Sequence, residues 1–234
     1  MFKTSSLKKV GLDRRLCVAP MMDWTDRHCR YFHRLLSPNA LLFTEMVTAE
    51  AILHAGADRF CVYHKSEHPL ALQLGGSEPD RLAAATRAVR DFGFDEINLN
   101  VGCPSPRVKA GCFGASLMGE PKLVAECVRA MQGETDRPVT VKCRIGIDNM
   151  DVIEGLNHFV DAQVQAGVKI IYLHARKAWL NGLSPKENRE VPPLNYARAG
   201  KLAADYPDLD IILNGGLETL EDIKNSAAAG QFSG

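Results

Sequence analysis

The chain has 234 residues, and its 28 Lys and Arg balance 28 Asp and Glu, so the formal net charge is zero. This balance excludes an overall field that attracts nucleic acid or membrane, and a polyanionic partner would need a local basic patch. The length allows one large domain with a substantial core, and no Pro/Ser-rich linker divides it. There is no run of about 18 apolar residues to span a membrane, and the first residues lack the apolar core of a signal peptide.

The predicted elements alternate along the chain between short apolar runs and amphipathic runs. Strands are expected at 16–22, 41–47, 70–74, 95–100, 139–144, 169–174 and 210–214. Helices are expected at 26–36, 49–54, 79–91, 121–131, 152–166, 195–205 and 220–228. This alternation indicates parallel strands joined by right-handed crossovers.

Repeating units of about 30 residues predict an α/β fold of the TIM (β/α)8-barrel type. A Rossmann-like sheet fits the alternation too, but no G-x-G-x-x-G follows the first strand. A barrel needs an eighth strand, and the chain stops at residue 234. We therefore expect an incomplete barrel, with strand eight and the elements after it missing.

The seven cysteines are an odd number and contain no C-x-x-C pair. A disulfide framework or a zinc site is therefore not expected, and a reducing, cytoplasmic location fits best. Most of these thiols should be small core residues, as predicted for Cys127 in an amphipathic helix. We expect no metal site, no membrane association and no obligate protein partner.

Polar side chains recur where the predicted strands end. They are Asp23, Glu45, Gln73, Asn98, Asn100, Lys142, Arg144, His174 and Asn214. The carboxyl ends of barrel strands ring one cavity, so these side chains should converge. One such residue is more often structural than functional, but the whole set favours a ligand site.

Lys142 is the most informative of these residues. Asn98 and Asn100, like Lys142 and Arg144, alternate with apolar residues, which places each pair on one face of its strand. An inward lysine should meet an anion, act as a nucleophile, or form an internal ion pair with Glu45.

Two loops complete the candidate site. Asn214-Gly215-Gly216 precedes a predicted helix and could present backbone N–H groups to a phosphate, although this tripeptide also makes ordinary turns. Cys103 lies just after a strand, in a loop held by Pro104 and Pro106. Its thiol could be a nucleophile with His174 as base, or a neutral acid that donates a proton.

Several segments together resemble the tRNA-dihydrouridine synthase family, in particular its bacterial A-type branch. The matching segments are VAPMMDWTDRHCRYFHRLL, LQLGGSEP, INLNVGCPS, RVKAGCFGASLM, VKCRIGID, HARKAWLNGLSPKENRE and NGGLETLED. The resemblance covers about residues 15–224. Many relatives have Asp in place of Pro106 and Cys in place of Ser116.

The resemblance implies that residues 1–234 are an FMN-binding TIM-barrel catalytic domain, without the family's C-terminal helical tRNA-binding domain. NADPH would reduce the FMN, and the substrate would be a D-loop uridine of tRNA, U20 or U20a. Hydride from flavin N5 would add to uracil C6, while Cys103 would give a proton to C5 from the opposite face.

The resemblance also assigns roles to individual residues. The isoalloxazine would meet Pro20, Met21, Met22, Gln73 and Lys142. The flavin phosphate would lie near His174, Asn214, Gly215 and Gly216. Asn100 would orient the uracil, Lys186 and Arg189 would contact tRNA, and the basic patch would include Arg107, Lys109, Arg176 and Lys177.

Three other functions remain open on the sequence. A Schiff-base aldolase would use Lys142 as its nucleophile, but would leave the Cys103 loop without a role. A flavin-dependent reductase of free pyrimidines would not need the basic patch. A catalytically impaired fragment would bind tRNA without turnover.

Overall fold

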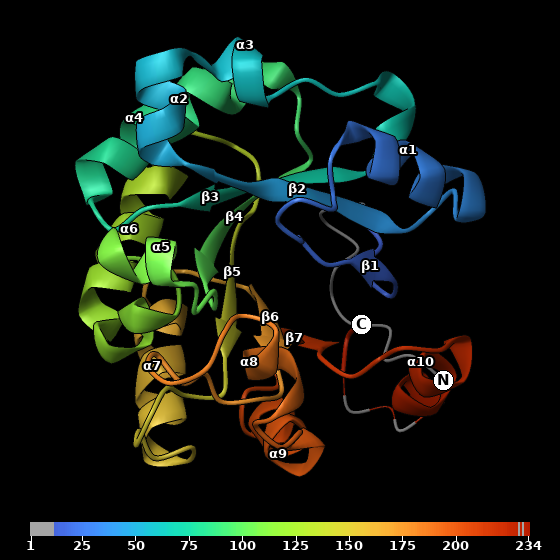
Figure 1. Cartoon of the computed structure of the whole chain (residues 1–234), viewed down its shortest axis with the longest axis vertical. Helices are drawn as coiled ribbons and strands as arrows, with labels where there is room; N and C mark the ends of the chain where they lie inside the picture. The colour runs from blue at the N-terminus through green and yellow to red at the C-terminus, as the bar shows by residue number, and fades with distance from the viewer. Residues whose placement is uncertain (1–11, 229, 231) are drawn as a thin grey trace.

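The computed structural model describes residues 12–228, 230 and 232–234. In this part of the chain, seven strands form one parallel sheet in sequential order. They are β1 (Cys17–Val18), β2 (Leu41–Thr48), β3 (Leu70–Gly75), β4 (Glu96–Val101), β5 (Val139–Arg144), β6 (Ile170–His174) and β7 (Asp210–Asn214). The sheet curls into a half-barrel with helices over its outer face (Figure 1). The predicted incomplete TIM-type barrel is confirmed.

The helices follow the predicted alternation. The longer ones are α1 (Arg27–Leu36), α2 (Ala49–Ala55), α4 (Pro79–Val89), α6 (Pro121–Gln132), α7 (Glu154–Gln165), α9 (Tyr196–Asp205) and α10 (Leu220–Ala228). Shorter helical turns are α3 (Ala57–Phe60), η2 (Lys65–Glu67), η3 (Arg90–Phe92), α5 (Pro106–Ala110), η4 (Gly114–Gly119) and α8 (Glu187–Glu190). Side-chain caps fix where several of them begin: Asp26 accepts hydrogen bonds from the first turn of α1, and Thr48 caps α2 in the same way.

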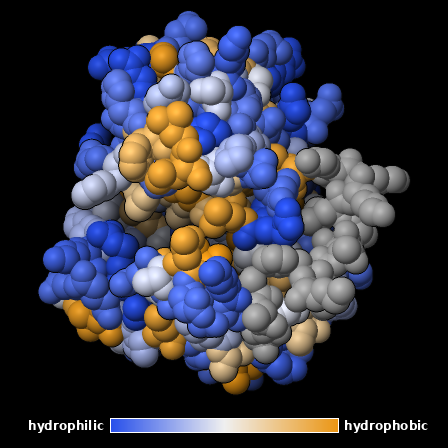
Figure 2. Space-filling view, turned by 90° about the vertical axis from the view of Figure 1, so that its right-hand side faces the viewer, coloured by the Kyte–Doolittle hydropathy of each residue, from blue (hydrophilic) through white to orange (hydrophobic). Residues whose placement is uncertain are grey.

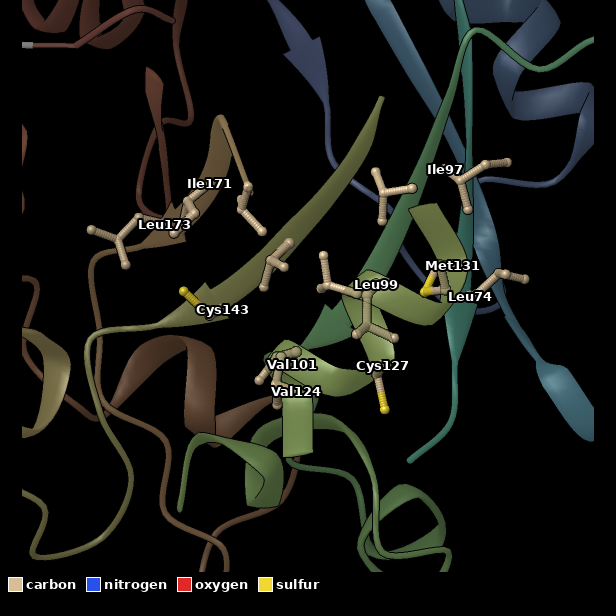
Figure 3. Packing of buried hydrophobic residues seen from close by; sticks show 14 of the residues in the cluster. Leu74, Ile97, Leu99, Val101, Val124, Cys127, Met131, Cys143, Ile171 and Leu173 are labelled. Atoms are coloured by element: carbon tan, nitrogen blue, oxygen red, sulfur yellow. The ribbon is translucent and has the colours of Figure 1, made fainter. Parts of the chain in front are cut away.

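The outward residues of the strands pack against the helices and form the main core. Figure 3 shows this layer between the middle strands and α6, where the side chains come from β3–β6 and from Val124, Cys127 and Met131. Cys127 is fully buried there, as predicted. Because neighbouring residues on a strand point to opposite faces, the alternate residues are left for the barrel interior.

The amino-terminal half of the interior is apolar. It contains Leu41, Phe43, Ala71, Ile170, Tyr172 and Ile212. The Phe43 and Tyr172 rings meet edge to face, with centroids 5.1 Å apart. This layer forms the floor of the barrel, below the polar side chains at the carboxyl ends of the strands.

The first strand differs from the prediction of 16–22, since only Cys17 and Val18 pair with β2. A turn replaces the rest, because the Met21 carbonyl accepts hydrogen bonds from the backbone N–H groups of Trp24 and Thr25. The Thr25 hydroxyl also bonds both backbone groups of Met21. The apolar run 20–22 therefore lies in a loop, where Met21 and Met22 are exposed.

A β-bulge interrupts β2 next to the interior. The register with β3 advances by one extra residue between Phe43 and Met46. The Thr44 hydroxyl accepts the Gln73 N–H at 3.1 Å and so replaces a lost backbone acceptor. The bulge turns Glu45 toward the loop after β1, where its carboxylate accepts the Asp23 N–H at 2.6 Å.

The last residues of the chain occupy the beginning of the eighth-strand position. Ser233 donates its backbone N–H to Ile211, and Gly234 accepts from Leu213. Gly234 also lies against the Arg14 backbone, where an added Cβ would come within 2.0 Å of the Arg14 oxygen. The edge of β7, which the absence of strand eight would leave free, is thus partly paired.

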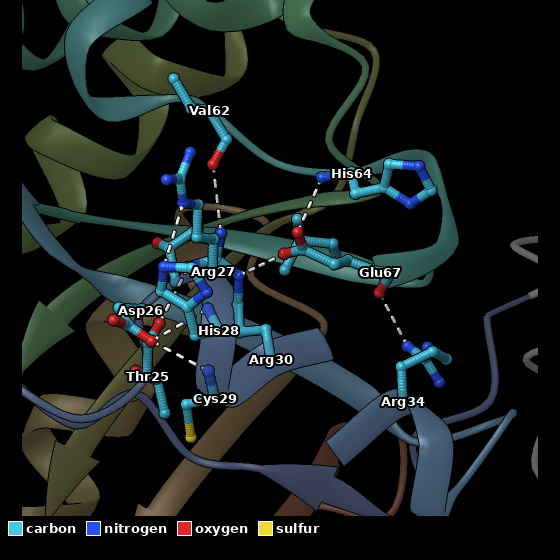
Figure 4. A network of polar contacts seen from close by, with 12 residues as sticks. Thr25, Asp26, Arg27, His28, Cys29, Arg30, Arg34, Val62, His64 and Glu67 are labelled. Carbon is cyan, nitrogen blue, oxygen red and sulfur yellow. Dashed lines mark hydrogen bonds and ion pairs between the residues drawn. The ribbon is translucent and has the colours of Figure 1, made fainter. Parts of the chain in front are cut away.

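A buried polar network holds α1 against the segment that leads into β3 (Figure 4). Arg30 donates to Glu67 at 2.6 Å and to the Thr25 carbonyl at 2.8 Å. Glu67 in turn accepts the His64 N–H at 2.7 Å. The opposite side of α1 is apolar and exposed, with Phe32, Leu35 and Leu36. Figure 2 shows that hydrophobic areas lie on the face of the molecule to which its view is turned.

The interior also contains a buried ion pair at its floor. Arg14 donates to Glu96 from Nε at 2.8 Å and from Nη2 at 2.6 Å, and both side chains are at most 1 % exposed. The Tyr172 hydroxyl donates to the same carboxylate oxygen at 3.2 Å. Removing one partner of such a pair leaves an uncompensated buried charge.

We therefore predict that Glu96→Ala lowers the free energy of unfolding by about 3–5 kcal/mol, measured by urea denaturation. The matched control is Asp205→Ala, which removes a carboxylate from the exposed pair with Lys201 and should cost less than about 1 kcal/mol. Equal losses in the two variants would contradict the assigned role of the Arg14–Glu96 pair.

Candidate functional site

Polar side chains line the interior above the apolar floor, at the carboxyl ends of β3–β7. The strand register places Gln73 beside Asn98, Asn100 beside Lys142, and Arg144 beside His174. His174 is in turn beside Asn214. The predicted convergence of Gln73, Asn100, Lys142, His174 and Asn214 is therefore found.

A one-way chain of hydrogen bonds links three of these strands, β3, β4 and β5. Asn100 donates to Gln73, Gln73 donates to Asn98, and Asn98 donates to the Thr140 hydroxyl, each at 2.8 Å. Thr140 then donates to Glu96 at 2.6 Å. Because an ionised carboxylate only accepts, Glu96 fixes the direction of every bond above it.

The top of this chain positions the Cys103 loop. With its N–H directed at Gln73, Asn100 has its carbonyl oxygen toward the loop, where it accepts the N–H groups of Gly102 at 3.1 Å and Cys103 at 3.0 Å. Cys103 itself is half-buried. The loop continues into α5, which Ser105 caps by accepting the Val108 N–H.

Lys142 has an amide partner in the described part of the chain. Its Nζ donates to Asn214 Oδ1 at 2.9 Å. Among the described residues it makes no ion pair with Glu45, which is bound to Asp23 instead. The pKa of the Lys142 amine is lowered from 10.5 to about 8, mainly by burial and secondly by the nearby Arg144 charge.

His174 is buried and held neutral. Burial lowers its pKa far below the usual range, and the positive charges of Arg144, Lys142, Arg176 and Arg189 act in the same direction. Its Nε2 atom has no hydrogen-bond partner among the described residues. Gly215, at φ +100°, packs directly against this ring, and an added Cβ would lie 2.4 Å from His174 Cδ2.

Arg144 joins the Cys103 loop to the segment that follows β6. It donates to the Gly102 carbonyl at 3.2 Å and to the Asn188 carbonyl at 2.9 Å. Burial lowers its pKa to about 10, while the Cys103 thiolate would raise it. The fully buried Asn188 folds this segment by bonding both backbone groups of Trp179.

The sequence places Arg144 in the polar ring without giving it a role of its own, and it does not identify Asn188 as a residue of the site. The signal for Arg144 was present, because it shares the inner face of its strand with Lys142. Nothing in the local sequence pattern points to Asn188, whose side chain forms its hydrogen bonds with Trp179, nine residues earlier in the chain.

Other predicted residues lie outside this inner group. Pro20, Met21 and Met22 are in the loop after β1, with the backbone N–H and carbonyl of Met21 already hydrogen-bonded. Arg189 on α8 and Lys186 at the N-cap of α8 are exposed. Arg189 is near enough to lower the pKa of His174, whereas no contact in the described residues brings Lys186 to the inner group.

Comparison with known proteins gives the family. The family model described as dihydrouridine synthase (Dus) matches residues 17–231, almost the whole chain. The chain belongs to the dihydrouridine synthase family. The tRNA-dihydrouridine(20/20a) synthase of Shewanella oneidensis is 58% identical over 221 residues, which are 94% of this chain and 66% of the relative.

Two further tRNA-dihydrouridine(20/20a) synthases are similar to the same extent. That of Vibrio cholerae is 59% identical over 90% of this chain and 64% of its own length. That of Xanthomonas axonopodis pv. citri is 57% identical over 93% of this chain and 65% of its own length. The chain thus spans slightly less than two thirds of these curated dihydrouridine synthases.

Two structural findings accompany this family assignment. Within the described residues, no group of three or more His, Cys, Asp or Glu side chains is arranged to hold a metal ion. The described helices also include none with both the length and the apolar character needed to cross a membrane.

The lowered pKa of Lys142 predicts a pH-dependent stability of this barrel. Between pH 8 and 10.5 the unfolded chain binds more protons at Lys142 than the folded chain. The free energy of unfolding therefore rises with pH across this window. Below pH 8 the folded chain carries the full free-energy cost of the buried charge. We expect Lys142→Met to be more stable than the wild type at pH 7 by about 1–3 kcal/mol.

This advantage should disappear as the pH approaches 10.5, and urea denaturation at pH 7 and pH 10 measures it. Lys201→Met, on the exposed face of α9, is the control and should show no such pH dependence. A Lys142→Met advantage that is the same at both pH values would show that the amine is not destabilised by burial.

Proposed function

We propose that the chain is the FMN-binding, catalytic barrel of a tRNA-dihydrouridine synthase that uses NADPH to reduce a D-loop uridine, U20 or U20a. The observation that carries this proposal is the convergence of a buried amine, a neutral imidazole and a tethered thiol at the mouth of the barrel. The family membership and the names of the similar proteins support the same substrate.

The residues at the mouth fit FMN. Nε2 of His174 is buried without a partner in the described chain, which suits a ligand donor or acceptor at that point. Gly215 beside His174 and Gly216 beside Leu194, at φ +100° and +70°, add no side chains to this backbone, as a phosphate site requires. Lys142 supplies a positive charge where a reduced isoalloxazine is negative.

Gln73 and Asn100 can each offer one more N–H group. The chain of hydrogen bonds uses one N–H of each amide, and a primary amide has two. Gln73 would direct its second N–H to the polar edge of the flavin, and Asn100 would direct its own to a uracil carbonyl. Pro20, Met21 and Met22 would border the flavin from the loop after β1.

FMN held by these residues would supply a hydride for C6 of the uracil, and NADPH would be the source of its electrons. Cys103 completes the reaction by transferring the proton of its thiol to C5 from the opposite face. The net change is the addition of two hydrogen atoms across the C5=C6 bond, and the Cys103 thiolate regains its proton from solvent. Lys142 and Arg144, whose charges interact with that thiolate, stabilise it.

The tRNA would lie across the basic residues around the mouth. Arg107 on α5, Arg189 on α8 and Lys186 at the N-cap of α8 are exposed. These side chains give a local positive surface on a chain of zero net charge. Contacts with phosphates would make tRNA binding fall steeply with salt.

One observation favours a second candidate function. A pKa of about 8 keeps a fraction of Lys142 neutral at physiological pH, as a Schiff-base nucleophile requires. Borohydride trapping of a carbonyl substrate on Lys142 would support an aldolase. Retention of flavin and reduction of tRNA would exclude it.

The central test is Cys103→Ala. The variant should retain FMN and its reduction by NADPH, while dihydrouridine formation in tRNA falls by about 10²–10⁴-fold. Cys112→Ala, which removes an exposed thiol from the same loop, is the matched control and should keep full activity. An active Cys103→Ala enzyme would remove this thiol from its role as the acid.

A second test concerns the cofactor and uses binding alone. Gly215→Ala should weaken FMN binding by about tenfold or more, because its methyl group would displace His174. Gly56→Ala imposes a similar backbone strain at φ +85° in open space and should leave FMN binding unchanged. Flavin fluorescence titration measures both, and equal affinities would place the cofactor elsewhere.

A further inference from the structure

A pocket lies beside the Cys103 loop, outside the polar group inside the barrel. Its volume is about 400 Å³, within the range of about 300–1,000 Å³ typical of small-molecule sites. One wall comes from the start of the loop and from α5, and the other comes from the segment after β6. The lining residues are Pro104, Pro106, Lys109, Ala110, Leu180, Asn181, Gly182 and Leu183.

The composition of the pocket suits a nucleotide. Prolines and leucines supply apolar surfaces on both walls, against which the face of a base can pack. Lys109 and Asn181 add one ammonium and one amide, joined across the pocket by a hydrogen bond. No carboxylate is among the lining residues, so a phosphate can approach Lys109 without repulsion.

The position of the pocket relates it to the reacting uridine. Pro104, in its wall, directly follows Cys103, and consecutive Cα atoms are about 3.8 Å apart. A strand that places one base against the Cys103 thiol therefore brings its neighbouring nucleotide to this pocket. The similar synthases are named for positions 20 and 20a, two adjacent nucleotides.

We infer that this pocket is a subsite for the nucleotide adjacent to the uridine under reduction, with its base between Pro106 and Leu183 and its phosphate at Lys109. The inference rests on the proposed function and extends it. A single active site could then serve two consecutive uridines, because a shift of the strand by one nucleotide places the second uridine at the thiol and a different neighbour in the pocket.

The test uses a D-loop RNA hairpin with 4-thiouridine next to the target uridine, bound to the FMN-loaded protein. Irradiation should cross-link the thiobase to peptides that contain residues 104–110 or 180–183. Ala110→Phe, which fills the pocket from the exposed surface of α5, should reduce this cross-link and the affinity for the hairpin by about tenfold. Ala204→Phe, on the exposed surface of α9, should change neither.

An abasic site in place of the neighbouring base supplies a test without any protein variant. It should weaken binding to the wild type by about tenfold and leave binding to Ala110→Phe almost unchanged, because the variant has already lost the contact. Cross-links in other peptides, no cross-link, or an equal abasic penalty in both proteins would overturn the subsite. Dihydrouridine formation, assayed separately on the unmodified hairpin, tests the proposed function independently.

Discussion

The carboxylate of Glu96 is the constraint on which the interior of this barrel depends. It is balanced by Arg14 below and accepts the Thr140 hydroxyl from above. A carboxylate cannot donate a hydrogen bond. The side-chain amides of Asn98, Gln73 and Asn100 therefore each have one orientation in which all bonds of the chain can form. That orientation leaves the Asn100 oxygen facing the N–H groups of Gly102 and Cys103. A charge at the floor thus fixes the backbone of a loop at the mouth.

Much of this arrangement could be predicted from the sequence, because period-two alternation is a strong signal in buried parallel strands. The pairs Asn98–Asn100 and Lys142–Arg144 were assigned to the inner face, and their register confirms it. The predicted first strand is too long, because an apolar run alone does not show that residues 20–22 lie in a turn. Only the hydrogen bonds of Met21 with Trp24 and Thr25 show that the chain leaves the sheet early.

The rest of the site depends on contacts between distant residues, which a single sequence does not encode locally. The bulge at Thr44 redirects Glu45 away from Lys142, so the predicted alternative of an ion pair between them is wrong for the described chain. Asn188 is a polar residue in a polar segment, and only its burial shows that it organises the loop held by Arg144. The cofactor and RNA roles of the predicted residues stay predictions.

The enforced neutrality of His174 has a consequence for the electrostatics of the mouth. With this imidazole unable to take up a proton in mildly acidic solution, the local positive charge comes from guanidinium and ammonium groups alone. The guanidinium groups stay charged from acid to neutral pH, and the Lys142 amine, with its pKa lowered to about 8, is mostly charged at pH 7 and becomes fully charged on acidification. The attraction that the mouth exerts on a polyanion should therefore be insensitive to moderate acidification of its surroundings.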